Sequence, residues 1–148
     1  MLQNTAAHAS VYLISDFGLS PRCCVVRNSY WWVGVPPSGP MDDRSFRKAN
    51  GLVGNRPDAA GLEITLAGPT LQFSYSGVAA LAGGGFGAEL RLRRADRRTK
   101  RLGAEAFSFN PGDILAIGAS DGSGCRSYLA LAGGIDVPVV TATPHSAA

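Results

Sequence analysis

Cysteine, histidine and methionine are scarce in this sequence of 148 residues, which contains three, two and two of them respectively. Cys23 and Cys24 are adjacent, and Cys125 stands alone far along the chain. This odd set has neither the pairing of a disulfide framework nor the spacing of a metal site. His8 and His145 lie near the two ends. We therefore expect no metal, and we expect thiols that are kept in a reducing compartment.

Long apolar runs are also missing. The N-terminal region has a short apolar stretch at residues 11–14, without a basic segment before it or a cleavage site of small residues after it. No run approaches the length of a membrane-spanning helix. A soluble cytoplasmic protein is expected.

Charge is limited, with 17% charged residues and a net charge of +3. Seven of the fourteen basic residues fall in the segment 91–101 (RLRRADRRTKR), around a single acid, Asp96. A nucleic-acid site would combine such charge with aromatic residues that stack on bases, and this segment has none. We interpret it as a solvated hairpin or loop.

Common catalytic signatures are absent, including the nucleophile elbow and the P-loop. The glycine run at 83–87 (GGGFG) is not followed by Lys-Ser/Thr, and the next residues indicate a strand rather than a helix. We interpret residues 82–85 (AGGG) as backbone that is able to approach another group closely.

Glycine and proline are abundant, with 19 and 9 residues. Tight turns require positive φ or a φ fixed by proline, so this composition favours a turn-rich β protein. The length suits one domain. We predict an atypical N-terminal segment at 1–28, a domain at 29–138 and an atypical C-terminal tail at 139–148.

One short helix is predicted over residues 44–53, where apolar residues recur at spacings of three and four. Asp42 or Asp43 offers its N-cap. Gly54 or Asn55 ends it, since either residue adopts the left-handed conformation that follows many helices.

Alternating or short apolar runs predict seven strands. These are residues 60–66, 70–75, 78–81, 88–94, 105–109, 114–117 and 127–132. The turn Asn110-Pro111-Gly112-Asp113 suggests that the fifth and sixth strands form a hairpin. The expected fold is mainly β, a small barrel or sandwich with one short helix.

Four segments resemble a known family. They are residues 33–55 (VGVPPSGPMDDRSFRKANGLVGN), 59–73 (AAGLEITLAGPTLQF), 111–118 (PGDILAIG) and 124–138 (GCRSYLALAGGIDVP). They are similar to the allophanate hydrolase subunit 2 family, also described as the carboxyltransferase domain, subdomains A and B. The form of the first segment resembles the urea carboxylase and urea amidolyase branch.

The resemblance implies a cyclophilin-like small β-barrel that transfers a carboxyl group from carboxybiotin to urea, giving allophanate. It implies biotin on a partner carrier domain, and as further partners a biotin carboxylase and the subunit 1-like half of the carboxyltransferase. No nucleic-acid or membrane partner is expected.

The chain departs from the family pattern at both ends. Residues 23–28 (CCVVRN) replace a Gln-Asp-Tyr-Pro-Gly-Arg-like strand, and the family sequence continues well beyond Pro138. We therefore expect the first half of the domain, inactive alone and prone to self-association through uncovered apolar surface. Two alternatives stay open. One is a component like the C subunit of 5-oxoprolinase, and the other is a non-catalytic interaction module that pairs with a subunit 1-like protein.

Carboxyl transfer to an amide requires groups that orient the amide, hold a carboxylate and take up a proton. By these criteria we predict three catalytic residues, Asp42, Asn50 and Arg126. Asn50 is unfavourable inside a helix and so invites a functional reason. Asp42 is also explained by N-capping, and Arg126 by a structural ion pair.

Five further residues are predicted to bind substrate: Ser38, Gly39, Asn55, Glu63 and Tyr128. Ser38 and Gly39 shape a proline-rich loop with free backbone N–H groups. Asn55 is equally explained as a helix C-cap. Glu63 falls on the polar face of its strand, where a solvent-facing side chain is the favoured interpretation. Tyr128 shares a strand face with Arg126 and is otherwise a half-buried tyrosine.

Overall fold

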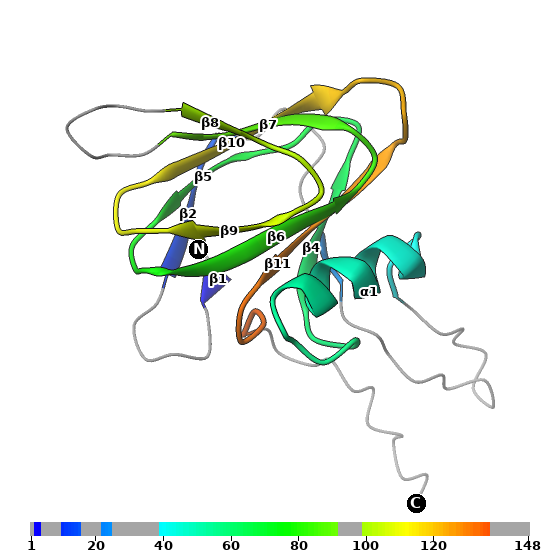
Figure 1. Ribbon diagram of the computed structural model, residues 1–148, viewed down its shortest axis with the longest axis horizontal. Coiled ribbons are helices and arrows are strands. Elements are labelled where there is room, and N and C mark those ends of the chain that lie inside the picture. Colours follow the sequence, from blue (N-terminus) through cyan, green and yellow to red (C-terminus); the bar gives the residue numbers. More distant parts are fainter. Residues whose placement is uncertain (1, 4–9, 16–21, 25–38, 92–98, 137–148) are drawn as a thin grey trace, which may run out of the picture.

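The computed structural model describes residues 2–3, 10–15, 22–24, 39–91 and 99–136. These residues form eleven strands and one helix, and the strands are arranged in two sheets that face each other across a common core (Figure 1). The prediction of a mainly β fold with one short helix is confirmed. No described helix has the length and apolar character that crossing a membrane would require.

The first sheet has six strands in the order β1-β2-β5-β10-β7-β8, and every pair is antiparallel. Its strands are β1 (Leu2–Gln3), β2 (Ser10–Ser15), β5 (Thr70–Phe73), β7 (Phe86–Arg91), β8 (Thr99–Leu102) and β10 (Ile114–Ser120). Strands β7 and β8 pair with each other, with Arg91 opposite Thr99, and the solvation of the basic segment 91–101 stays a prediction. Residues 92–98 between them lie outside the described residues.

The second sheet has five strands in the order β3-β4-β11-β6-β9, again antiparallel. Its strands are β3 (Arg22–Cys24), β4 (Gly61–Thr65), β6 (Gly77–Gly83), β9 (Ala106–Phe109) and β11 (Arg126–Leu131). Strands β1, β2 and β3 fall within residues 1–28, and they add to both sheets. The predicted tail at 139–148 lies outside the described residues, so the division into three segments stays a prediction.

Successive strands alternate between the two sheets. From β4 to β7, and again from β8 to β11, each connection carries the chain from one sheet to the other. The predicted hairpin of residues 105–109 and 114–117 is therefore wrong, because β9 pairs with β6 while β10 pairs with β5 and β7. The turn Asn110–Asp113 is present, with the Asp113 amide donating to the Asn110 carbonyl (3.0 Å), but it joins two sheets.

The main core fills the space between the sheets. Its members are apolar residues that point inward from both, and Phe73 stacks on Phe109 with ring centroids 3.7 Å apart. The largest fully buried aliphatic members are Leu62, Ile64, Leu71, Leu115, Ile117, Leu129 and Leu131. Alternation along β4, β5, β10 and β11 directs these side chains to one face of each strand.

The helix α1 (Asp43–Leu52) packs on the outer face of the second sheet, against β11, β6 and β4 (Figure 1). Its buried residues Phe46 and Ala49 meet Tyr128 and Ala130 there, and the ring of Phe46 contacts that of Tyr128 edge to face at 5.8 Å. Asp42 caps the helix, and Gly54 follows it at φ 72°, as the sequence indicated. This outer face is therefore buried too.

The glycine run packs against the β10–β11 connection, as predicted. Gly83 has φ 120°, and a Cβ built there would meet the Arg126 carbonyl oxygen at 2.6 Å. At Gly84 a Cβ would lie 2.9 Å from the backbone of Gly124. The chain needs glycine at both positions because two backbones touch at this corner.

Candidate functional site

The charged part of the second sheet lies on the outer face, beside the start of α1. Glu63 on β4 is the register partner of Tyr128 on β11, and Thr65 is the partner of Arg126. Residues two apart on a strand point to the same face, so these four side chains form one group. The sequence placed Arg126 and Tyr128 together, but it contained no indication that Glu63 and Thr65 lie opposite them.

Glu63 is buried, with 8% of its surface exposed. The favoured interpretation of Glu63 as a solvent-facing side chain is wrong, because α1 and the residues before it cover this face. Its Oε2 atom accepts hydrogen bonds from the Tyr128 hydroxyl (2.8 Å) and from the backbone amide of Met41 (2.8 Å). A buried carboxylate requires such donors.

Asp42 holds two roles at the helix start. Its carboxylate accepts from the Ser45 amide at 3.1 Å, and its own amide donates to the Tyr128 hydroxyl at 2.7 Å. The hydrogen bonds from Ser45 lower the pKa of the Asp42 carboxyl. This N-cap agrees with the structural explanation considered for Asp42, and the carboxylate is accounted for within the fold.

Arg126 is partly buried, and its side chain is 24% exposed. Its Nη1 group donates to the Thr65 hydroxyl and lies 3.7 Å from Glu63 Oε1. Its Nε atom is buried and has no hydrogen-bond partner among the described residues. An unsatisfied buried donor of this kind favours an acceptor supplied from elsewhere.

Asn50 and Asn55 lie at the other end of α1. Asn50 is fully buried, and its Nδ2 group donates to the Ala59 carbonyl (2.9 Å). Asn55 donates from Nδ2 to Asn50 Oδ1 (3.0 Å) and to the Leu131 carbonyl (2.8 Å), and its Oδ1 accepts from the Gly133 amide (2.9 Å). Both amides are therefore used to fasten the helix end to β11.

The predicted site residues thus separate into two groups. Asp42, Glu63, Arg126 and Tyr128 converge at the start of α1, whereas Asn50 and Asn55 converge at its end. Gly39 is exposed and lies just before the first group. Ser38 lies outside the described residues. Sequence reasoning missed the Met41 amide, which has no side-chain signal, and Thr65, whose position two residues after Glu63 would have placed it on the same strand face.

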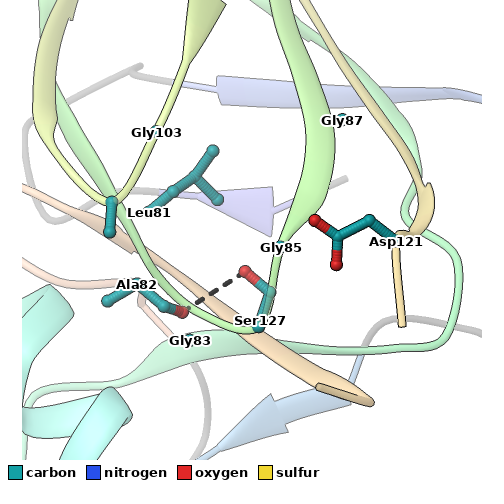
Figure 2. A pocket seen from close by; sticks show the side chains of 10 residues that line it. Leu81, Ala82, Gly83, Gly85, Gly87, Gly103, Asp121 and Ser127 are labelled. Carbon is teal, nitrogen blue, oxygen red and sulfur yellow. Dashed lines mark hydrogen bonds between the residues drawn. The ribbon is translucent and has the colours of Figure 1, made fainter. Parts of the chain in front are cut away.

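A separate pocket of about 360 Å³ lies at the glycine corner (Figure 2). It is lined largely by backbone of the glycine run, with Asp121 at one side and Ser127 donating to the Ala82 carbonyl at 3.3 Å. Hydrogen bonds from Ser123 lower the pKa of Asp121. None of the predicted site residues lines this pocket, and the described residues contain no cluster of His, Cys, Asp and Glu that fits a metal.

Several known proteins are similar to this chain in sequence. Urea amidolyases from Lachancea kluyveri and Saccharomyces cerevisiae are 45% and 42% identical over 112 residues, which is 76% of this chain and 6% of theirs. The C subunit of the Escherichia coli 5-oxoprolinase is 40% identical over 114 residues, covering 77% of this chain and 34% of that protein. The chain thus spans a small part of each of these relatives.

Solved structures agree. The Kluyveromyces lactis urea carboxylase matches with a TM-score of 0.76 and 40% identity over 86% of this chain and 11% of that one. The K. lactis urea amidolyase matches with a TM-score of 0.77 and 39% identity over 87% of this chain and 7% of that one. Residues 33–144 match the family described as "Carboxyltransferase domain, subdomain A and B". This chain therefore belongs to the carboxyltransferase domain family, subdomains A and B.

Proposed function

We propose that this chain forms part of the carboxyltransferase of a biotin-dependent urea carboxylase, which moves a carboxyl group from carboxybiotin to urea and so makes allophanate. The observation that carries the proposal is the identity of 42–45% to urea amidolyases over 112 residues. The matching family segment, 33–144, contains the charged group at the start of α1.

Arg126 is the residue that we propose to contact the transferred group. A guanidinium binds a carboxylate through paired N–H donors and stays charged at any pH of interest. The buried Nε without a partner among the described residues fits a group rich in acceptors, such as a carboxylated ureido ring. Biotin on a partner carrier would supply the activated carboxyl group.

The remaining predicted residues divide by what their polar atoms already contact. We propose that the loop bearing Ser38 and Gly39 meets the urea amide through backbone donors, as backbone N–H groups suit a carbonyl. Asp42 orders the start of α1 beside that loop. Asn50 and Asn55 hold the other end of the helix. We propose that they fix the position of the helix beside the site and do not bind the amide.

Other polypeptide segments complete the proposed enzyme. This chain corresponds to 6% of the urea amidolyases and 34% of the 5-oxoprolinase relative. We propose that it works with a subunit 1-like half of the carboxyltransferase, a biotin carboxylase and a biotin carrier. Alone it contributes one wall of the site, so we expect no carboxyl transfer from the chain alone.

The test is reconstitution. The full chain is mixed with the complementary carboxyltransferase segments of a urea carboxylase relative, a carboxylated biotin carrier and labelled urea, and allophanate is measured. We expect product from the complete mixture and none when this chain is omitted. A folded, assembled mixture that makes no allophanate would rule out the catalytic role.

A second candidate function is that of a 5-oxoprolinase component. It is favoured by the 40% identity to the 5-oxoprolinase relative, a protein of which this chain covers a larger share than it does of the amidolyases. The matching test replaces urea by 5-oxoproline and measures its stimulation of ATP hydrolysis in a complex with the partner subunit. Stimulation by 5-oxoproline, with no allophanate from urea, would move the assignment to this branch. Stable binding to the partner with neither activity would indicate a non-catalytic interaction module.

A further inference from the structure

We propose that Glu63 and Tyr128 are positioning residues that hold the backbone of Met41 and Asp42, and with it the loop of residues 39–42 before α1, on the outer face of the sheet. This inference deepens the proposed function and rests on it for its catalytic consequence. The sequence suggested that both residues bind substrate. Their contacts indicate a different task.

The donor and the acceptor of each hydrogen bond in this group are determined. A backbone amide only donates, so the Tyr128 hydroxyl accepts from the Asp42 amide and gives its own proton to Glu63 Oε2. The Met41 amide donates to the same Oε2 atom. Two successive backbone amides are therefore fixed by two side chains from adjacent strands, and the single hydroxyl proton of Tyr128 is directed at Glu63.

Packed side chains surround this arrangement. Tyr128 is fully buried, and its ring packs edge to face against Phe46 of the helix that follows the two amides. Glu63 is paired across the strands with Tyr128, and its Oε1 atom lies 3.7 Å from Arg126 Nη1. Met41 itself is 74% exposed, so its position depends on the backbone bond rather than on side-chain packing.

The consequence for catalysis follows from geometry. Gly39 and Pro40 lie immediately before the held amides in the chain, and the Nη1 atom of Arg126 lies 3.7 Å from Glu63 Oε1. Glu63 thus sets the distance between the loop and the guanidinium, the two parts that we propose to contact substrate. Small displacements of such groups lower the rate strongly without any change in their chemistry.

The first test is amide hydrogen exchange on the full chain. Tyr128→Phe removes the hydroxyl and keeps the ring on Phe46, while Glu63→Gln keeps the shape and removes the charge. We expect exchange of the Asp42 amide to rise roughly fivefold in Tyr128→Phe, the factor that corresponds to one ordinary hydrogen bond. The Met41 amide should exchange faster in Glu63→Gln. Ser127→Ala is the matched control, because it removes a buried hydroxyl from the preceding residue of β11, whose hydroxyl donates to the Ala82 carbonyl.

Unchanged exchange at both amides in folded Tyr128→Phe and Glu63→Gln variants would overturn the proposal. So would equal acceleration in the Ser127→Ala control, because the effect would then reflect general loss of stability. A double variant adds a check. Since the two residues share a hydrogen bond, their effects on exchange should combine to less than the product of the single effects.

The second test uses the reconstituted enzyme. We expect both variants to lower kcat at every pH while the pH–rate profile keeps its shape, since a positioning residue neither gives nor takes a proton in the reaction. Loss of one limb of the profile in Glu63→Gln would make Glu63 a general base and overturn the assignment. If the wild-type mixture makes no product, the proposed function fails, while the exchange data still decide whether the two residues hold the loop.

Discussion

The side-chain amides of Asn50 and Asn55 are joined by a hydrogen bond of 3.0 Å and together fasten the end of α1 to the end of β11. Asn55 uses both of its N–H donors and its oxygen within the fold. Asn50 is fully buried between the helix and the Ala59 carbonyl. The pair holds the end of the helix against the second sheet, as Asp42 and Tyr128 hold its start.

Replacing Asn55 by aspartate should therefore destabilise the protein strongly. Asn55→Asp places an oxygen where Nδ2 donates to Asn50 Oδ1 and the Leu131 carbonyl, so two acceptors lose their donor. We expect a loss of about 3 kcal/mol in the free energy of unfolding, because unsatisfied buried polar groups each cost about 1–3 kcal/mol. Guanidinium chloride unfolding followed by fluorescence measures it. The reverse exchange at an exposed site, Asp58→Asn, should change stability little, and equal stability of Asn55→Asp and wild type would contradict the role of the pair.

The N-cap at Asp42 should contribute stability that depends on pH. Its carboxyl pKa is lowered by the hydrogen bonds from Ser45, so the folded state favours the ionised form. A group with a depressed folded-state pKa stabilises the protein above its unfolded pKa, and the contribution is lost as pH falls through the folded value. Asp42→Ala should cost about 1 kcal/mol at neutral pH, and the difference from wild type should shrink below the ordinary value of 3.8.

Thermal unfolding across that pH range measures the difference. Asp43→Ala removes the neighbouring carboxylate, whose partner is the exposed Arg47, and serves as the control. A difference between Asp42→Ala and wild type that stays constant with pH would show that the charge of Asp42 is not what stabilises the helix.

Gly83 should not tolerate a side chain. Gly83→Ala forces an L residue to φ 120° and brings its Cβ to 2.6 Å from the Arg126 carbonyl oxygen. We expect a loss of at least about 2 kcal/mol, the scale of backbone strain combined with a clash. Gly87→Ala is the matched variant, because a Cβ there has nothing within 4 Å and should leave the midpoint of thermal unfolding nearly unchanged. Similar midpoints for the two variants would contradict the close approach of the two backbones.

Arg126→Lys tests the proposed contact with the transferred carboxyl group. Lysine keeps the charge opposite Glu63 but lacks the planar fork that binds a carboxylate with two donors. In the reconstituted enzyme we expect the rate of allophanate formation to fall by more than about tenfold. This factor corresponds to the loss of one charge-assisted hydrogen bond. Arg56→Lys, at an exposed ion pair with Asp58, should leave the rate unchanged. A full rate in Arg126→Lys would remove Arg126 from the site.

Much of the fold could be predicted from local patterns. The helix was expected at 44–53 and lies at 43–52, with its N-cap at Asp42 and a left-handed residue at Gly54. These ends could be predicted because helix caps depend on residues that are adjacent in sequence. Seven of the eleven described strands lie close to the expected ranges, since alternation of apolar residues reflects burial of one face, whereas β1, β2, β3 and β8 were not predicted. The close contact of the glycine run was also predictable, as only glycine suits it.

The errors arose where distant parts of the chain meet. A turn signal such as Asn110–Asp113 predicts a change of direction but not whether the next strand pairs with the last one. Glu63 alternates with apolar residues as a solvent-facing residue would, yet α1 covers its face. The pairing of Glu63 with Tyr128, 65 positions apart, depends on the register of β4 and β11, which no local pattern records.

The alternation of successive strands between the sheets means that neither sheet is a continuous piece of chain. β10 and β11 adjoin in sequence, yet each lies inside a different sheet, with neighbours on both sides. A single cut in the turn at 110–113 would therefore leave β10, an interior strand of the first sheet, and β11, an interior strand of the second sheet, together on the C-terminal fragment. Neither fragment would retain a whole layer, so we expect the two sheets to assemble and come apart together, at the slow rate of topologies dominated by distant contacts.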